Sequence, residues 1–326
     1  MVTGGRKTKL ATLAALGLAT ASCTALPDTS GYTAASLQLR TSAAAAGSAL
    51  STELGRMTEL LPAARRPDAV SIAGQFDEAW ATTVASLGAL GRYAESIEAV
   101  TKAGNNGAAA ANGVADSVNG LAGALGIVPG AALVGVATDT FAFIYSQIAN
   151  IRATRSLERS LDLADPLIRD MSNVVGGQVT AAKALFQQAI QLEGQALDFG
   201  VDDIAALDAD LETRENDAAR TLAALAAQGG RDDARRAADA ELKRIRDGRA
   251  AIAPRMAAYR TARTALAARA RAGNELFAAT DNALATWREG HTKMVRAIRE
   301  RRPVSFESLT AAAQEIRELS RRWRDL

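Results

Sequence analysis

The chain has very few cysteine and histidine side chains, which serve as metal ligands, nucleophiles and general bases. Its 326 residues include one cysteine, Cys23, and one histidine, His291. A metal site of the His/Cys kind needs several such ligands, so only carboxylate sites stay open. No G-x-S-x-G motif marks a nucleophilic serine, and neither a dinucleotide-binding nor a P-loop glycine motif offers a phosphate cradle. We therefore expect a protein that is not an enzyme and that has no cofactor.

His291 lies within an apolar pattern of helical spacing, next to Trp287, Met294 and Val295. A histidine in such a pattern is either a general base or a packed residue of a helix seam. With no nucleophile motif elsewhere, we predict the seam position. Trp80 and Trp287 are likewise in phase with apolar neighbours, which is typical of packing anchors rather than of a stacking platform.

The first 22 residues have the order of an export signal. Arg6, Lys7 and Lys9 form a positive segment, residues 10–18 form a short apolar run, and small residues follow. This order predicts a signal peptide that is removed from the mature protein. An uncleaved anchor is disfavoured because this apolar run is too short for a membrane span.

The signal ends in Thr20-Ala21-Ser22-Cys23. This tetrapeptide resembles the lipobox of bacterial lipoproteins, and the resemblance covers the first 23 residues only. It implies that Cys23 becomes the mature N-terminus, carries acyl chains such as palmitate, and holds the protein at a membrane. The implied location is the cell envelope, outside the cytoplasm, and the outer membrane if the source is Gram-negative. Thr20 replaces the usual leucine, and Ala19-Thr20-Ala21 offers an alternative cleavage after Ala21 without lipid.

Charge gives no sign of a nucleic-acid partner. The whole chain has 38 basic and 36 acidic residues, and three of the basic residues lie in the signal. The mature chain therefore has a net charge of −1, and no basic footprint for nucleic acid is expected. A single cysteine cannot form a disulfide within the chain, so stability must come from packing.

Composition predicts an all-α fold. Alanine, leucine, glutamate and arginine are abundant, aromatic residues make up 4% of the chain, and there are only seven prolines. These residues favour helix over strand. We expect residues 23–32 to be a tether and residues 33–326 to form an elongated antiparallel helical bundle with coiled-coil-like seams.

Turn and cap residues divide this bundle into helices. The predicted helices span residues 33–61 and 68–102, another starts at Asp165-Pro166, and a further helix capped by Asp202 runs to about residue 228 before a Gly229-Gly230 turn. A long stripe then runs from Ile245 to Ile298, broken by the charged Arg249. Pro254 should kink it, and a last helix should start at Ser305.

One region is unusually apolar. The 22 residues between Asp116 and Asp139 carry no charge, and Pro129-Gly130 interrupts them near the middle. This break favours two short helices, so we expect a Gly/Ala-rich hairpin at about 108–150 that is buried in the bundle. The alternative is a membrane-contacting element. Its contact residues would be Leu121, Leu125, Ile127, Val128, Leu133 and Val134.

Two functions remain after these exclusions. The first is a membrane-anchored, extracytoplasmic helical lipoprotein with a structural or partner-binding role, whose protein partner and oligomeric state stay open. The second is a membrane-inserting protein, because an apolar hairpin between longer amphipathic helices resembles the general plan of α-helical pore-forming toxins. No motif supports that second resemblance, which is architectural only.

Overall fold

The computed structural model describes residues 26–104, 107–126, 138–199 and 201–326. Within these ranges the chain is all-α, as predicted, with eight helices and no strand. The helices are α1 (Ser30–Leu60), α2 (Arg66–Lys102), α3 (Ala108–Ala124), α4 (Thr138–Ala153), α5 (Leu157–Phe199), α6 (Asp202–Gln228), α7 (Asp232–Glu300) and α8 (Glu307–Arg324).

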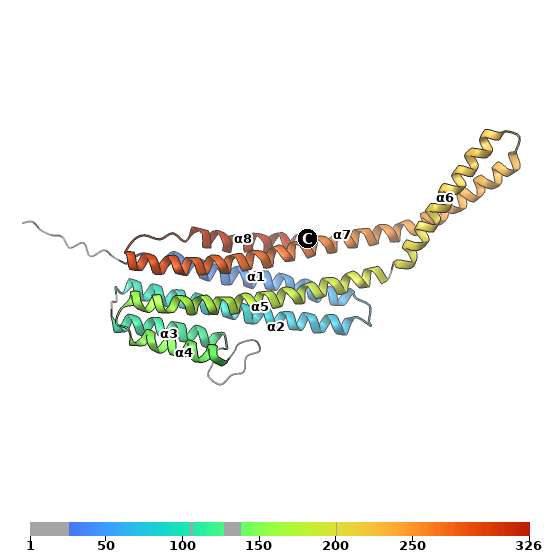
Figure 1. Cartoon of the computed structure of the whole chain (residues 1–326). Coiled ribbons are helices and arrows are strands. Elements are labelled where there is room, and N and C mark those ends of the chain that lie inside the picture. The colour runs from blue at the N-terminus through green and yellow to red at the C-terminus, as the bar shows by residue number, and fades with distance from the viewer. Residues whose placement is uncertain (1–25, 105–106, 127–137, 200) are drawn as a thin grey trace, which may run out of the picture.

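The helices form a long bundle with one projecting arm (Figure 1). In the bundle α1 packs against α2 and α8, and α5 packs against α2 and α7. The hairpin of α3 and α4 lies along α2 and α5. α6 packs against α7, and together they extend beyond the end of the bundle. We call residues 202–255 the arm, and its base includes the adjoining end of α5 at Phe199.

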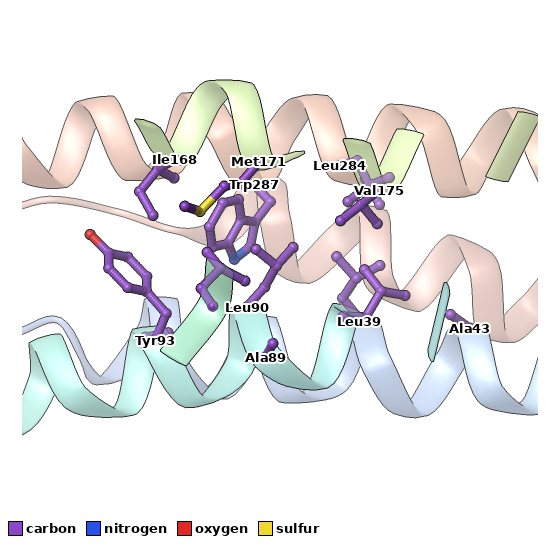
Figure 2. Packing of buried hydrophobic residues seen from close by; sticks show 14 of the residues in the cluster. Leu39, Ala43, Ala89, Leu90, Tyr93, Ile168, Met171, Val175, Leu284 and Trp287 are labelled. Carbon is purple, nitrogen blue, oxygen red and sulfur yellow. The ribbon is translucent and has the colours of Figure 1, made fainter. Parts of the chain in front are cut away.

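The bundle core is one continuous hydrophobic cluster that includes side chains from α1, α2, α3, α4, α5, α7 and α8. Trp287 of α7 is its largest fully buried side chain. Figure 2 shows the Trp287 ring beside Met171 of α5 and Leu90 of α2. Burying aromatic and aliphatic side chains together removes a large apolar area from water, so this cluster stabilises the bundle as a unit.

Close packing also requires glycine at one helix contact. A Cβ atom added to Gly47 of α1 would lie only 1.8 Å from the Trp80 ring of α2. The indole nitrogen of Trp80 donates a hydrogen bond to the carbonyl oxygen of Ala43, at 2.9 Å. Glycine thus lets the tryptophan lie against the α1 backbone, where no other residue would leave room for the ring.

The prediction that a helix starts at Asp165-Pro166 is wrong. α5 begins at Leu157 and runs through Pro166 without a break. A proline inside a helix removes one hydrogen bond and costs roughly 3 kcal/mol. Leu161, Ala164 and Leu167 on either side of it are fully buried. Their burial on a single helical stripe outweighs that cost, which local sequence rules do not include.

Other boundaries agree more closely with the sequence. α6 begins at Asp202, and Gly229 and Gly230 form the following turn with positive φ angles of 64° and 70°. α7 is continuous for 69 residues and passes through Pro254. α8 begins at Glu307, two residues after the predicted start at Ser305, and the Ser305 Oγ accepts a hydrogen bond from the Glu307 amide at 3.3 Å.

Candidate functional site

The predicted site residues fall into two groups. Leu121 and Leu125, at the end of α3, are 1% and 5% exposed and belong to the core cluster. Outside the described residues lie Cys23, Ile127, Val128, Leu133 and Val134. Within the described ranges, no helix is both long and apolar enough to cross a membrane.

The strongest polar cluster of the bundle surrounds His291, which is fully buried in the helix seam as predicted. Its Nδ1 atom lies 2.8 Å from Asp165 Oδ1 of α5, and its Nε2 atom lies 2.7 Å from the Tyr93 hydroxyl of α2. Thr292 also donates a hydrogen bond to Asp165, at 3.0 Å. The cluster therefore links three helices whose residues are far apart in sequence.

The hydrogen bonds define a protonation pattern for this cluster. Burial opposes ionisation of Asp165, but the hydrogen bond and charge of His291, the Thr292 hydroxyl and the Arg169 guanidinium hold the pKa of this carboxyl below its ordinary value. Asp165 is then a carboxylate that only accepts, so Nδ1 of His291 carries a proton. Burial raises the pKa of Tyr93 well above its ordinary value, so its hydroxyl keeps its proton where it lies 2.7 Å from Nε2.

This arrangement resembles a catalytic His-Asp pair, but its geometry assigns it to packing. The second imidazole nitrogen is occupied by the Tyr93 hydroxyl, where a serine or cysteine nucleophile would have to lie. Both His291 and Tyr93 are within the hydrophobic core and are 1% exposed or less. A fully satisfied buried network rigidifies a core, and we assign this role to the His291 cluster.

A second buried polar group lies further along the bundle. The guanidinium of Arg269 on α7 donates to Glu193 of α5 at 2.7 Å and also pairs with Glu53 of α1. Burial opposes ionisation of Glu53, but hydrogen bonds from Arg56 and Arg269 lower its pKa. Two carboxylates and two guanidiniums balance their charge here, so the group also ties helices together.

The arm is built differently from the bundle. No residue of α6 is fully buried. α6 has seven acidic and two basic residues, whereas residues 231–255 have eight basic and five acidic residues. Leu242 and Ile245 of α7 are nevertheless buried in the seam with α6. Complementary charge and a thin apolar seam together hold these two helices.

Arg249 explains the charged position in the predicted stripe. Its guanidinium lies 3.2 Å from Asp208, 2.9 Å from Glu215 and 3.4 Å from Glu212, all on α6. Glu215 also binds Arg246 at 2.9 Å. A polar group at a seam position favours one register of two helices over others. Arg249 therefore fixes the register of the arm.

The arm exposes apolar surface at its base and near its tip. At the base, the Phe199 and Leu207 side chains are 87% and 45% exposed. Near the tip, a hollow of about 840 Å³ lies between the two helices. It is lined on α6 by Ala219, Leu222, Ala223 and Ala226, and on α7 by Leu242 and charged residues. Exposed aromatic and aliphatic side chains rimmed by charge are typical of protein-binding surfaces.

The two ends of α7 are far apart. The Tyr32 ring, two residues into α1, lies 5.4 Å from the ring of Phe306 and 6.4 Å from that of His291, near the C-terminal end of α7. The turn at Gly229 and Gly230 lies at the other end of α7. At about 1.5 Å per residue, the helix separates these ends by roughly 100 Å.

Sequence reasoning did not find the partners of His291. Tyr93 and Asp165 lie 198 and 126 positions away from it, and only a three-dimensional arrangement brings them together. The charged residue within an apolar stripe was the one local signal, and at Arg249 it marked a real polar layer. Among the described residues, no group of histidine, cysteine and carboxylate side chains could hold a metal ion.

No family model, no curated protein and no solved structure matches this chain.

Proposed function

We propose that this chain is a membrane-anchored, extracytoplasmic helical lipoprotein with a partner-binding role, and that the arm carries the binding surface. The main support is the position of the arm. It lies at one end of α7, and the start of α1 lies near the other end. If Cys23 carries acyl chains, the bundle stands on the membrane and presents the arm away from it.

The anchor supports this proposal through simple energetics. Acyl chains contribute about 0.8 kcal/mol per buried methylene, so several chains on one residue hold a protein stably at a membrane. The first described residue, Leu26, is three positions from Cys23, and α1 starts at Ser30. A short tether of this kind keeps the near end of the bundle close to the lipid.

The arm supports the partner-binding role through its exposed apolar side chains. Phe199 contributes little to folding because most of its surface is in contact with solvent. Exposed aromatic residues are common anchors of protein interfaces. Asp198 next to it accepts hydrogen bonds from Tyr259 at 2.8 Å and Arg263 at 3.2 Å, which holds the base of the arm in place.

Two measurements test the proposal. The Cys23→Ser variant should move from the membrane fraction to the soluble fraction. Photo-crosslinking residues at Leu207 and Ala226 of the arm should give protein adducts in cells, whereas the same residue at Gln314 of α8 should not. The Phe199→Ser change should abolish the Leu207 adduct without altering the melting temperature. Equal adducts from Gln314, or membrane retention of Cys23→Ser after a salt wash, would contradict the proposal.

The membrane-inserting alternative requires part of the buried core to become exposed. Leu121 and Leu125 would have to leave the core cluster before they could contact lipid. Val114, Val118, Ile144 and Ile148 are buried in the same cluster and would leave with them. Dye release from liposomes by the Cys23→Ser chain would favour this alternative over the partner-binding role.

A further inference from the structure

A groove lies between α2 and α3, away from the arm. Its volume is about 430 Å³, which is within the range of small-molecule pockets. Ala99 and Gly120 line its open part, and Ala89, Tyr93 and Leu121 lie beneath it with 3% exposure or less. The Tyr93 hydroxyl is already bonded to His291, so it is not available to a ligand in the groove.

The rim of this groove carries positive charge without a matching carboxylate. Arg92 lines the groove, and Arg40 of α1 lies beside Arg92 at Gly88 of α2. Arg92 Nη1 and Arg40 Nε lie 3.7 and 3.2 Å from the point where a Gly88 side chain would start. The absence of that side chain lets the two guanidiniums approach each other.

The acidic residues nearby do not neutralise these arginines. Asp116, the one acidic residue of the groove lining, pairs with Arg152 of α4 at 2.7 Å. Glu95, one turn from Arg92 on α2, forms no ion pair with either arginine. Throughout the described part of the chain, no carboxylate lies within ion-pair distance of Arg40 or Arg92. An anion placed at the rim would relieve their mutual repulsion.

We propose that the groove between α2 and α3 binds a small anionic amphiphile. The phosphate or carboxylate head lies at Arg92, with Arg40 beside it, and a short apolar body lies along Ala99 and Gly120. Guanidinium groups bind both kinds of head through charge-assisted hydrogen bonds. The Ser96 hydroxyl in the lining offers a further hydrogen bond. The head has two sources, a free metabolite or a membrane lipid, and both share this chemistry.

Binding is tested by calorimetry on the Cys23→Ser chain, which keeps every described residue. The probes are octyl phosphate, octyltrimethylammonium and inorganic phosphate. We expect octyl phosphate to bind at least tenfold more tightly than either of the others, since one lacks the negative head and the other lacks the apolar body. Equal affinity for octyltrimethylammonium, or no binding of octyl phosphate, overturns the proposal.

Two pairs of variants place the ligand in this groove. In Gly120→Leu a side chain fills the groove without meeting any atom within 4 Å at its Cβ, and Gly123→Leu adds the same side chain to α3 outside it. The first should abolish binding and the second should not. Arg92→Gln should weaken binding about tenfold, as expected for a lost charge-assisted bond, whereas Arg317→Gln on α8 should not. Unchanged affinity in Gly120→Leu overturns the assignment to this groove.

Vesicles separate the two sources of the ligand. Binding to phosphatidylglycerol vesicles but not to phosphatidylcholine vesicles, with loss in Arg92→Gln, identifies a lipid headgroup. Octyl phosphate binding without vesicle binding identifies a free ligand. Both outcomes support the groove, and neither depends on whether the arm binds a partner.

Discussion

The bundle and the arm both hold antiparallel helices together, but they do so with different interactions. The bundle buries aromatic and aliphatic side chains from seven helices in one cluster and links polar side chains across helices, as around His291. The arm has two helices, no fully buried residue on α6, and a register set by Arg249 and three carboxylates. Global stability should therefore depend on the bundle, while the arm is free to vary its surface.

The largest expected effect is in the bundle core. Trp287→Ala removes a fully buried ring and its hydrogen bond to Ser36, at 2.9 Å. We expect a loss of about 3–5 kcal/mol in the free energy of unfolding, measured by urea denaturation. Leu207→Ala in the arm is the control and should change the unfolding free energy by less than about 1 kcal/mol. Similar losses in the two variants would remove the distinction between the regions.

A smaller effect is expected where α1 meets α2. Gly47→Ala places a methyl group against the Trp80 ring and displaces its hydrogen bond to Ala43. The overlap should lower the free energy of unfolding by roughly 2 kcal/mol. This loss exceeds the gain of about 1 kcal/mol that alanine gives over glycine in a helix. Gly55→Ala, on the same helix with nothing within 4 Å, should raise the melting temperature instead. Stabilisation by both changes would show that the ring moves without penalty.

The His291 cluster should make the bundle sensitive to acid. Because the pKa of Asp165 is lower folded than its ordinary 3.8, its contribution to stability is present above 3.8 and is lost as the pH falls below that value. The contribution should be on the order of 1 kcal/mol, since the carboxyl is partly screened by water. Unfolding free energy measured between pH 6 and pH 2 should fall less steeply in Asp165→Asn than in the parent chain.

Glu53 provides the comparison for this acid effect. Its pKa is also lowered, so its contribution is lost over a similar range below its ordinary 4.5. Asp165→Asn should therefore remove part of the acid sensitivity, and the double change with Glu53→Gln should remove more. If the unfolding free energy of Asp165→Asn depends on pH as it does in the parent chain, then His291 does not stabilise the Asp165 carboxylate.

The smallest effect on global stability is expected in the arm. Arg249→Ala leaves Asp208, Glu212 and Glu215 facing one another without their shared guanidinium. We expect the melting temperature of the bundle to stay nearly constant, while amide hydrogen exchange becomes faster within α6. Arg244→Ala, which removes an exposed pair within α7, should leave exchange in α6 unchanged. Faster exchange throughout the bundle would show that the two regions unfold together.

Sequence predicted best what neighbouring residues determine. The Gly229-Gly230 turn and the start of α6 at Asp202 follow from local backbone preferences, and both are confirmed. The seam position of His291 follows from helical spacing and is also confirmed. Pro166 is the clearest failure, because burial of Leu161 and Leu167 by other helices overrides a local rule.

The site residues show where such reasoning stops. The three carboxylates that bind Arg249 lie across a single hairpin turn, so a register model of two helices could have found them. Tyr93 and Asp165 could not be found in this way, since nothing in their own neighbourhood distinguishes them from other polar residues of a helix. The Arg40 and Arg92 pair depends on Gly88 at a contact between two helices, which only the packed structure shows.

α7 is one continuous helix that belongs to both the arm and the bundle. The other side of the arm changes from α5 to α6 between Phe199 and Asp202, whereas α7 stays one continuous helix and bends where the arm leaves the bundle. A force applied at the tip would therefore travel along α7 and reach Trp287 and His291 directly. Tension on a partner bound at the arm would act on Trp287 and His291, which also hold the bundle together.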